Sequence, residues 1–248
     1  MAAGLGLAYG RVGSALAAPL APARDAPSTL LSTIRQLNVG NLQYRTLVAN
    51  PGEPYLPRLD VLGKSPSENR TKNRRSLYYL GHLSDVHIID AQSPARLEPL
   101  LAVSVGTFSG SARPQDTLTV NVLTETVNAM TALRVSPVTG APVAASLNTG
   151  DNADMHSQLE LKWYIETLDG ASITPNSGAP DVYDGMQAWL DTQMIYHPEQ
   201  PEGDEYGAYG FPRIPGLLDA AVSQTVTSPG LDAPWYTVFG NHDALYFG

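Results

Sequence analysis

Three short clusters of polar residues contain the side chains with which this sequence could do chemistry. They are Asp85-Val86-His87, Gly150-Asp151-Asn152-Ala153-Asp154 and Gly240-Asn241-His242-Asp243. In an extended segment, residues i and i+2 point to the same side, so Asp85 and His87 can face one ion. The candidate ligands are oxygen atoms and imidazole nitrogens without sulfur, because the chain contains no cysteine. Such ligands suit Mn²⁺, Fe, Zn²⁺ or Mg²⁺.

Each cluster taken singly has an ordinary structural interpretation. An Asp-x-His triplet is common in turns and capped loops, and Asp151 with Asp154 is typical of a helix N-terminus with an acidic first turn. The segment from Gly240 to Asp243 has the composition of a β-turn. A shared site is favoured because all three clusters follow predicted strands, which unrelated turns would rarely do.

The elements that would position these clusters alternate between strand and helix. Short apolar runs rich in Val, Tyr and Leu precede each cluster and predict buried strands. Residues 116–134 have their apolar side chains on one helical face, with Asp116 as a candidate N-cap, and residues 155–168 predict a second helix. This order predicts an α/β fold with a largely parallel sheet, and the clusters should meet at its carboxyl edge. The three predicted strands lie within residues 76–85, 142–151 and 233–241.

Composition limits the partners that the chain can have. With 248 residues, of which 43% are hydrophobic, the chain can bury a core. Its net charge of −9 argues against stable nucleic-acid binding or attachment to an anionic membrane. An acidic protein can still bind phosphate when metal ions supply the positive charge. The sequence has no apolar run of the roughly 20 residues that a transmembrane helix needs, and it leaves the oligomeric state open.

The N-terminal segment, residues 1–27, is rich in Ala and Pro. It is interpreted either as a flexible extension or as the remnant of an export signal, so the predicted location is the cell envelope or the extracellular space, with the cytoplasm as the alternative. Residues 28–248 form the predicted domain. Within it, residues 29–37 predict a short helix capped by Ser28, and residues 39–75 are expected to be irregular or short-stranded.

A long insertion is predicted at about residues 171–216, with one short helix near residues 186–194. Its aromatic side chains could stack on a substrate, but packing of the insertion onto its own domain is favoured. These side chains are Tyr196, Tyr206, Tyr209 and Phe211.

Three motifs of the chain resemble, in order and character, the first signature blocks of the calcineurin-like metallophosphoesterase superfamily. LSDVHI, TGDNAD and FGNHD correspond to D-x-H, G-D-x-x-D and G-N-H-[DE]. The resemblance covers about residues 76–243, and the flanking sequence is similar to an actinobacterial, often exported branch. It implies a four-layer α/β/β/α sandwich of mixed sheets, with roughly the N-terminal half present. It also implies a phosphoric ester hydrolase acting on a small-molecule or nucleotide phosphoester.

The resemblance further implies a centre of two divalent metal ions, which could be Mn, Fe, Zn or Mg. Carried over position by position, Asp85 and His87 would bind the first ion, and Asp151 would bridge both. Asn241 would bind the second ion through its side-chain carbonyl. A metal-bound water or hydroxide would then attack phosphorus in line.

The catalytic residues that the resemblance implies are His242, which would face the phosphoryl group, and Asp154, which would orient it. The family pattern continues with a lone histidine and a G-H-x-H block, and neither follows before Gly248. The domain is therefore expected to be incomplete at its C-terminus, and this chain to be weakly active or inactive.

Two other functions remain to be weighed. A non-catalytic metal-binding or cell-surface protein on the same scaffold would also account for the missing histidines. A Rossmann-type nucleotide binder is disfavoured because no G-x-G-x-x-G follows the first strand. Of the histidines outside the clusters, His82 is expected in the core or at a sheet edge, and His156 and His197 at the surface.

Overall fold

The computed structural model describes residues 28–244 apart from positions 55, 57, 66, 74, 109 and 190–192. The predicted extension, residues 1–27, lies outside the described residues. The fold is mixed α/β, with three small sheets among the residues described.

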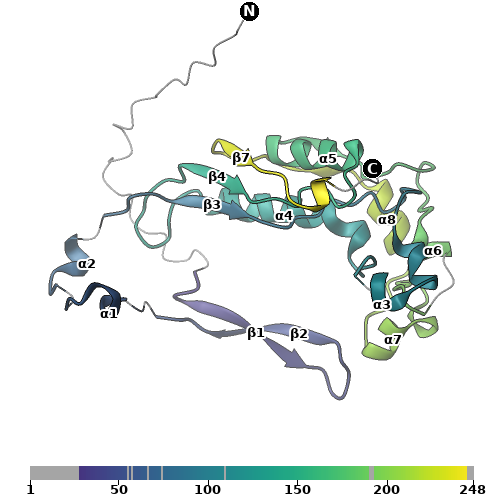
Figure 1. The fold of residues 1–248 in the computed structure, drawn as a ribbon, viewed down its shortest axis with the longest axis horizontal. Coiled ribbons are helices and arrows are strands. Elements are labelled where there is room, and N and C mark those ends of the chain that lie inside the picture. Colours follow the sequence, from purple (N-terminus) through teal and green to yellow (C-terminus); the bar gives the residue numbers. More distant parts are fainter. Residues whose placement is uncertain are drawn as a thin grey trace, which may run out of the picture.

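The central sheet consists of three parallel strands in the order β3, β4, β7 (Figure 1). β3 spans Leu80–Leu83, β4 spans Ala145–Asn148 and β7 spans Trp235–Thr237. The three apolar runs of the sequence therefore form neighbouring parallel strands, and this part of the prediction is confirmed.

Two helices pack against one face of this sheet. α4 (Thr119–Ala132) and α5 (Gln158–Asp169) match the two predicted helices to within a few residues at each end. The side chain of Ser157 caps α5 by accepting a hydrogen bond from the Leu159 backbone nitrogen at 3.2 Å. Among the described residues, no helix has the length and apolar character that crossing a membrane requires. The core between these helices and the sheet consists of Leu83, Ile88, Val120, Leu123, Val127, Trp163, Tyr164, Leu168 and Ile173.

Asp116 does not cap α4, so this prediction was wrong. The residue that precedes α4 is Leu118, and Asp116 begins a 3₁₀ turn, η2 (Asp116–Leu118), in which it is buried. Its Oδ2 accepts a hydrogen bond from the Arg113 backbone nitrogen at 3.1 Å and lies 3.6 Å from Arg96 Nη2. The carboxylate thus pairs with a buried arginine instead of with a helix terminus.

The opposite face of the central sheet carries exposed apolar side chains. Leu80, Leu147 and Tyr236 are 42%, 37% and 62% exposed. All three point away from α4 and α5, since side chains alternate between the two faces of a strand and Leu83 on β3 is buried with these helices.

The helix predicted for residues 29–37 is wrong. β1 (Ser32–Asn38) pairs antiparallel with β2 (Arg45–Pro51) over their whole length. Ser28 caps a turn before β1, because its Oγ accepts a hydrogen bond from the backbone nitrogen two residues on. Cross-strand hydrogen bonds stabilise the extended form, whereas a helix of nine residues would be marginal.

The insertion contains little regular structure, as expected. Of the helix predicted near residues 186–194, the structure describes α6 at 186–189. The four aromatic side chains pack against one another, with ring centroids 5.2 to 6.3 Å apart, and Phe211 also contacts Tyr44 outside the insertion, as the favoured interpretation predicted. The remaining elements are α1 (Leu59–Leu62), α2 (Arg70–Asn73), η1 (Glu98–Ala102), α3 (Val105–Phe108), β5 (Ser172–Ile173), α6 (Met186–Trp189), η3 (Pro201–Gly203), α7 (Glu205–Tyr209), α8 (Leu217–Ser223), β6 (Val226–Thr227) and η4 (His242–Ala244).

Candidate metal centre

The segments that follow β3 and β4 stay side by side beyond the ends of the strands. The backbone nitrogen of Asp85 donates to the Gly150 carbonyl at 3.1 Å, and that of His87 donates to the Asp151 carbonyl at 2.9 Å. Ile88 and Ala153 then form an isolated parallel bridge. The first two polar clusters are therefore fixed next to each other by main-chain hydrogen bonds.

Asp243 fixes the third cluster to the second. Its Oδ1 accepts hydrogen bonds from the backbone nitrogens of Asn152 and Ala153 at 2.9 and 2.8 Å. Its Oδ2 accepts from Gly240 N at 2.8 Å and from Asn152 Nδ2 at 2.9 Å. One carboxylate thus satisfies several loop donors at once, and it determines where His242 lies. The sequence analysis gave Asp243 no role, although it stands in the third cluster.

The glycines of the second and third clusters permit this close approach. Gly150 has φ +112°, and a Cβ at this position would lie 2.8 Å from Gly240 N. A Cβ on Gly240 would collide with the carboxylate of Asp151. The two loops can therefore meet only where both positions lack a side chain.

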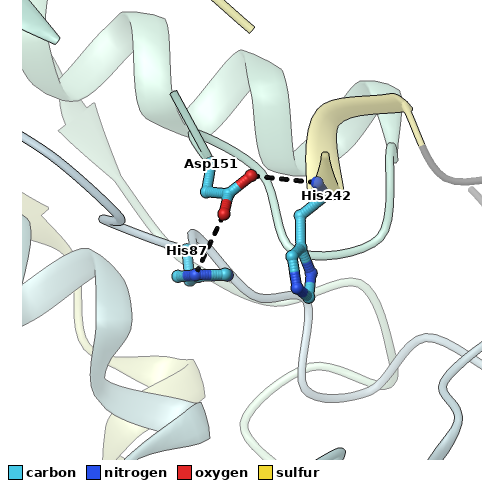
Figure 2. A group of neighbouring side chains, drawn as sticks. All are labelled: His87, Asp151 and His242. Carbon is cyan, nitrogen blue, oxygen red and sulfur yellow. Dashed lines mark hydrogen bonds and ion pairs between the residues drawn. The ribbon is translucent and has the colours of Figure 1, made fainter. Parts of the chain in front are cut away.

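His87, Asp151 and His242 form a group that could hold a metal ion (Figure 2). One potential ligand atom from each lies within 4.8 Å of the others. His87 Nε2 is 3.8 Å from Asp151 Oδ2, and the His242 backbone nitrogen donates to Asp151 Oδ1 at 2.9 Å. Because ligand nitrogens and oxygens lie about 2.0–2.2 Å from a zinc ion, the spacing of His87 and Asp151 lets one ion contact both.

Three of the predicted metal ligands have an unusual backbone conformation. Asp85, His87 and Asp151 have φ values of +55°, +42° and +53°. A residue other than glycine seldom adopts positive φ, and the conformation persists only where the surrounding structure enforces it. Strained residues gather at functional sites, so the backbone gives independent support to a site here.

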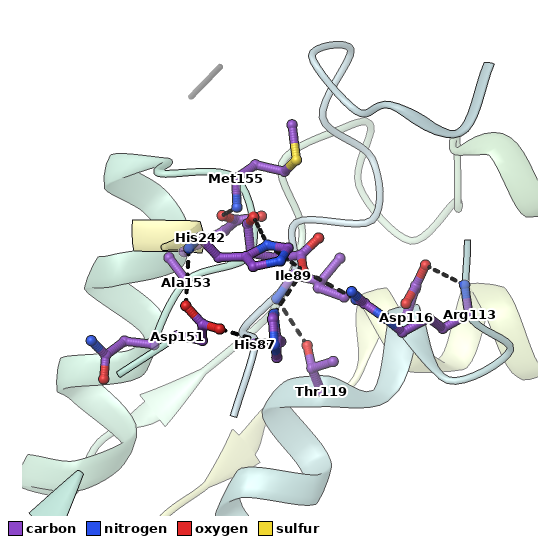
Figure 3. A network of polar contacts seen from close by, with 12 residues as sticks. His87, Ile89, Arg113, Asp116, Thr119, Asp151, Ala153, Met155 and His242 are labelled. Atoms are coloured by element: carbon purple, nitrogen blue, oxygen red, sulfur yellow. Dashed lines mark hydrogen bonds and ion pairs between the residues drawn. The ribbon is translucent and has the colours of Figure 1, made fainter. Parts of the chain in front are cut away.

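Asp154 orients both imidazole rings, those of His87 and His242, which Figure 3 shows near Asp151. Its Oδ1 lies 2.9 Å from His87 Nδ1, and its backbone carbonyl lies 2.8 Å from His242 Nδ1. Burial favours a higher pKa for Asp154, but the hydrogen bond with His87 and the charges of Arg96 and Arg113 outweigh it, so the pKa is well below its usual range. Asp154 is therefore ionised, and its contact with His87 Nδ1 leaves Nε2 of His87 on the side of Asp151.

Asp85 and Asn241 lie beside this group. The exposed carboxylate of Asp85 accepts a hydrogen bond from Ser84 Oγ and is not one of the three grouped ligands. Asn241 is exposed and directly precedes His242. Of the three predicted ligands that are histidine or carboxylate, the structure therefore groups His87 and Asp151 within reach of one ion. It adds His242 as a possible third ligand, a role that the sequence analysis did not assign.

A buried charge network supports Asp154 from behind. Arg96 Nη1 donates to Asp154 Oδ2 at 3.1 Å, and Arg113 Nη1 donates to Asp154 Oδ1 at 3.0 Å. Arg96 also pairs with Glu98 and Asp116, and burial raises the pKa of Asp116 to about 7 despite the opposing charge of Arg96. The sequence analysis missed both arginines because they lie in an irregular segment without motif or periodicity.

The remaining histidines lie outside the group. His82 is exposed on β3, at the edge of the central sheet, with Nε2 3.1 Å from Thr149 Oγ1. His156 is exposed, as predicted. His197 is half-buried instead of exposed, because its Nδ1 lies 2.6 Å from the Gln187 carbonyl.

Comparisons with protein-family models, with curated proteins and with solved structures gave no match to this chain. The resemblance to the metallophosphoesterase superfamily therefore stays a prediction that depends on the three motifs.

Proposed function

We propose that this chain belongs to a metal-dependent phosphoric ester hydrolase with a centre of two divalent ions. The observation that carries the proposal is the convergence of His87, Asp151 and His242 beyond the carboxyl ends of three neighbouring parallel strands. In parallel α/β sheets this edge is where ligands bind.

The donor set fits divalent ions. The His87 imidazole and the Asp151 carboxylate suit Mn²⁺, Fe or Zn²⁺, and the contact of His87 with Asp154 is the arrangement that commonly orients a metal-ligating histidine. Asp85, His87, Asp151 and Asn241 would hold the ions of the proposed centre. The chemistry supplied by bound ions would be neutralisation of the phosphoryl oxygens and activation of a water.

The protein's own residues would position and protonate the substrate. His242 has a side chain that is 28% exposed, and its Nδ1 is held by the Asp154 carbonyl, so its other nitrogen is left to face a phosphoryl group. In this role His242 would stabilise charge or donate a proton to the leaving oxygen. In the proposed four-layer fold, a second sheet would cover the exposed apolar face of β3, β4 and β7.

A second candidate function is metal binding without hydrolysis. It is favoured by one observation: the three grouped ligands suffice for a single ion, and the Asp85 carboxylate lies outside the group. A protein with this site could hold an ion for structural or storage purposes.

Metal content and phosphoester hydrolysis, measured on the same preparations, test both candidates. We expect the purified chain, loaded with Mn²⁺ or Zn²⁺, to hydrolyse p-nitrophenyl phosphate or its bis-ester, however slowly. Asp151→Asn should lose this activity at least about a hundredfold, since loss of mere orienting partners already costs 10–100-fold. Asp232→Asn, an exposed acid, is the matched control.

The outcomes separate the candidates. Hydrolysis that needs Asp151 and about two ions per chain supports the esterase. One tightly bound ion without hydrolysis of any phosphoester supports the second candidate. A chain that binds neither Mn²⁺ nor Zn²⁺ contradicts both.

A further inference from the structure

A second group of oxygen atoms surrounds a small closed cavity away from the metal centre. The cavity has a volume of about 10 Å³ and lies between the segment that contains η1 and η2 and the insertion. Figure 3 shows Asp116 and Arg113, which line it, on the opposite side of His87 from Asp151. A space of this size admits one water-sized particle. Its lining includes Glu98, Asp116, Tyr183, Gln187, Tyr196 and Tyr206.

Three buried oxygens of the lining residues have no hydrogen-bond partner among the described residues. They are Glu98 Oε2, Asp116 Oδ1 and Gln187 Oε1. The three residues are only 5%, 5% and 6% exposed. Gln187 Nε2 donates to the Tyr196 carbonyl at 3.0 Å, which fixes the amide so that its oxygen is the unpaired atom. Buried acceptors without partners are costly, and three beside one cavity call for a common partner.

The charges around Arg96 do not balance. Glu98, Asp116, Asp154 and Glu160 all lie within 4.0 Å of its guanidinium. Of these four carboxylates, Arg113 and the two histidines of the metal centre pair with Asp154 alone, so Glu98 and Asp116 share Arg96 as their cationic partner. Burial raises the pKa of Glu98 and of Asp116, although the charge of Arg96 opposes it, so each carboxylate is costly to keep ionised without a further positive partner.

We propose that this cavity binds a hard divalent cation, with Ca²⁺ the best fit, through Glu98, Asp116 and Gln187. One water molecule has two hydrogens and would leave one of the three acceptors unpaired, whereas a cation held between them would face all three and offset the charge of the two carboxylates. Ca²⁺ tolerates irregular oxygen coordination, whereas Mg²⁺ demands near-ideal octahedral geometry. The ion would join the insertion, through Gln187, to the segment whose arginines hold Asp154. This inference does not depend on the proposed hydrolase activity.

Terbium luminescence offers a direct test, since Tb³⁺ replaces Ca²⁺ at oxygen sites and is sensitised by nearby tyrosines. Tyr183, Tyr196 and Tyr206 line the cavity. We expect sensitised emission that Ca²⁺ displaces, and a rise in melting temperature with added Ca²⁺. Both effects should persist in His87→Ala, which removes a candidate ligand of the metal centre but no residue that lines the cavity.

Two variants in opposite directions distinguish binding from a general loss of structure. Glu98→Gln should weaken Ca²⁺ binding at least about tenfold, and Gln187→Glu, which adds a charged ligand, should strengthen it. Glu125→Gln, at an exposed position, should bind like the parent chain. The proposal is overturned if Ca²⁺ neither displaces Tb³⁺ emission nor raises the melting temperature. It is equally overturned if both variants bind like the parent, or if the effects disappear in His87→Ala.

Discussion

Replacing Asp243 by Asn tests whether one carboxylate assembles the candidate metal centre. In the parent chain both oxygens of Asp243 accept hydrogen bonds from the loops at 240 and at 152–153. An amide keeps one oxygen and turns an NH₂ group toward donors. If the amide oxygen takes the Oδ1 position, the NH₂ group takes the Oδ2 position. The hydrogen bonds from Gly240 N and Asn152 Nδ2 are then lost, and these two donors face the new NH₂ group.

The magnitude follows from the two lost bonds. A hydrogen bond to a charged group contributes about 1.5–3 kcal/mol, so the loss at this half-buried position is about 3 kcal/mol. For a chain of this size, 1 kcal/mol shifts the melting temperature by about 2–4 °C, which gives a decrease of about 6–12 °C. Because the same bonds place His242 next to Asp151, the affinity for Zn²⁺ or Mn²⁺ should also fall about 10–100-fold.

Thermal unfolding followed by circular dichroism, together with a metal titration, measures both effects. Asp232→Asn is the control, because Asp232 makes a 4.0 Å ion pair between exposed side chains, and such surface changes stay within about 0.5 kcal/mol. The reasoning is refuted if Asp243→Asn melts within about 2 °C of the control and binds metal equally well.

Three further substitutions probe the surroundings of the site. Asp154→Asn should destabilise the chain by about 3–5 kcal/mol, because buried Arg96 loses a charged partner; a urea melt no different from that of the parent contradicts this. Asp116 has a folded-state pKa of about 7, above its ordinary 3.8, because burial outweighs the charge of Arg96. The folded chain therefore holds this proton more tightly than the unfolded chain does. In EDTA the free energy of unfolding should fall by up to about 4 kcal/mol as the pH rises from about 4 to 7. Asp116→Asn should remove this slope in urea melts between pH 4 and 8, and an unchanged slope would show that another group is responsible. Gly150→Ala should lower the free energy of unfolding by more than about 2 kcal/mol, because positive φ is combined there with a backbone collision. Gly63→Ala, at φ +59° in open space, should lower it by about 1 kcal/mol. Equal melting temperatures of the two variants would exclude the collision.

The strands of the central sheet and the turns after them could be predicted, because they depend on residues close together in the sequence. The apolar runs at residues 76–85, 142–151 and 233–241 predict strands, and the glycines after them predict sharp turns. The order of elements then predicts parallel pairing, so the convergence of His87 and Asp151 follows from general rules of α/β topology.

The prediction failed where tertiary contacts outweigh local preference. Residues 29–37 have a weak helical pattern, yet pairing with residues 45–51 makes them a strand. Asp116 has the residue type and place of an N-cap, yet it pairs with Arg96, twenty residues away along the chain. In both cases the deciding partner lies far enough away that no local pattern reveals it.

The sequence by itself determined the three polar clusters, the strands that precede them and the carboxyl edge at which they meet, because strand patterning and turn chemistry act over a few residues. Only the tertiary structure decided that Arg96 and Arg113 hold Asp154 from 58 and 41 residues away, and that Asp243 holds Asn152 from 91 residues away. Charged partners are chosen by proximity in the folded chain and by the cost of burying a charge unpaired, and neither is visible in residue order.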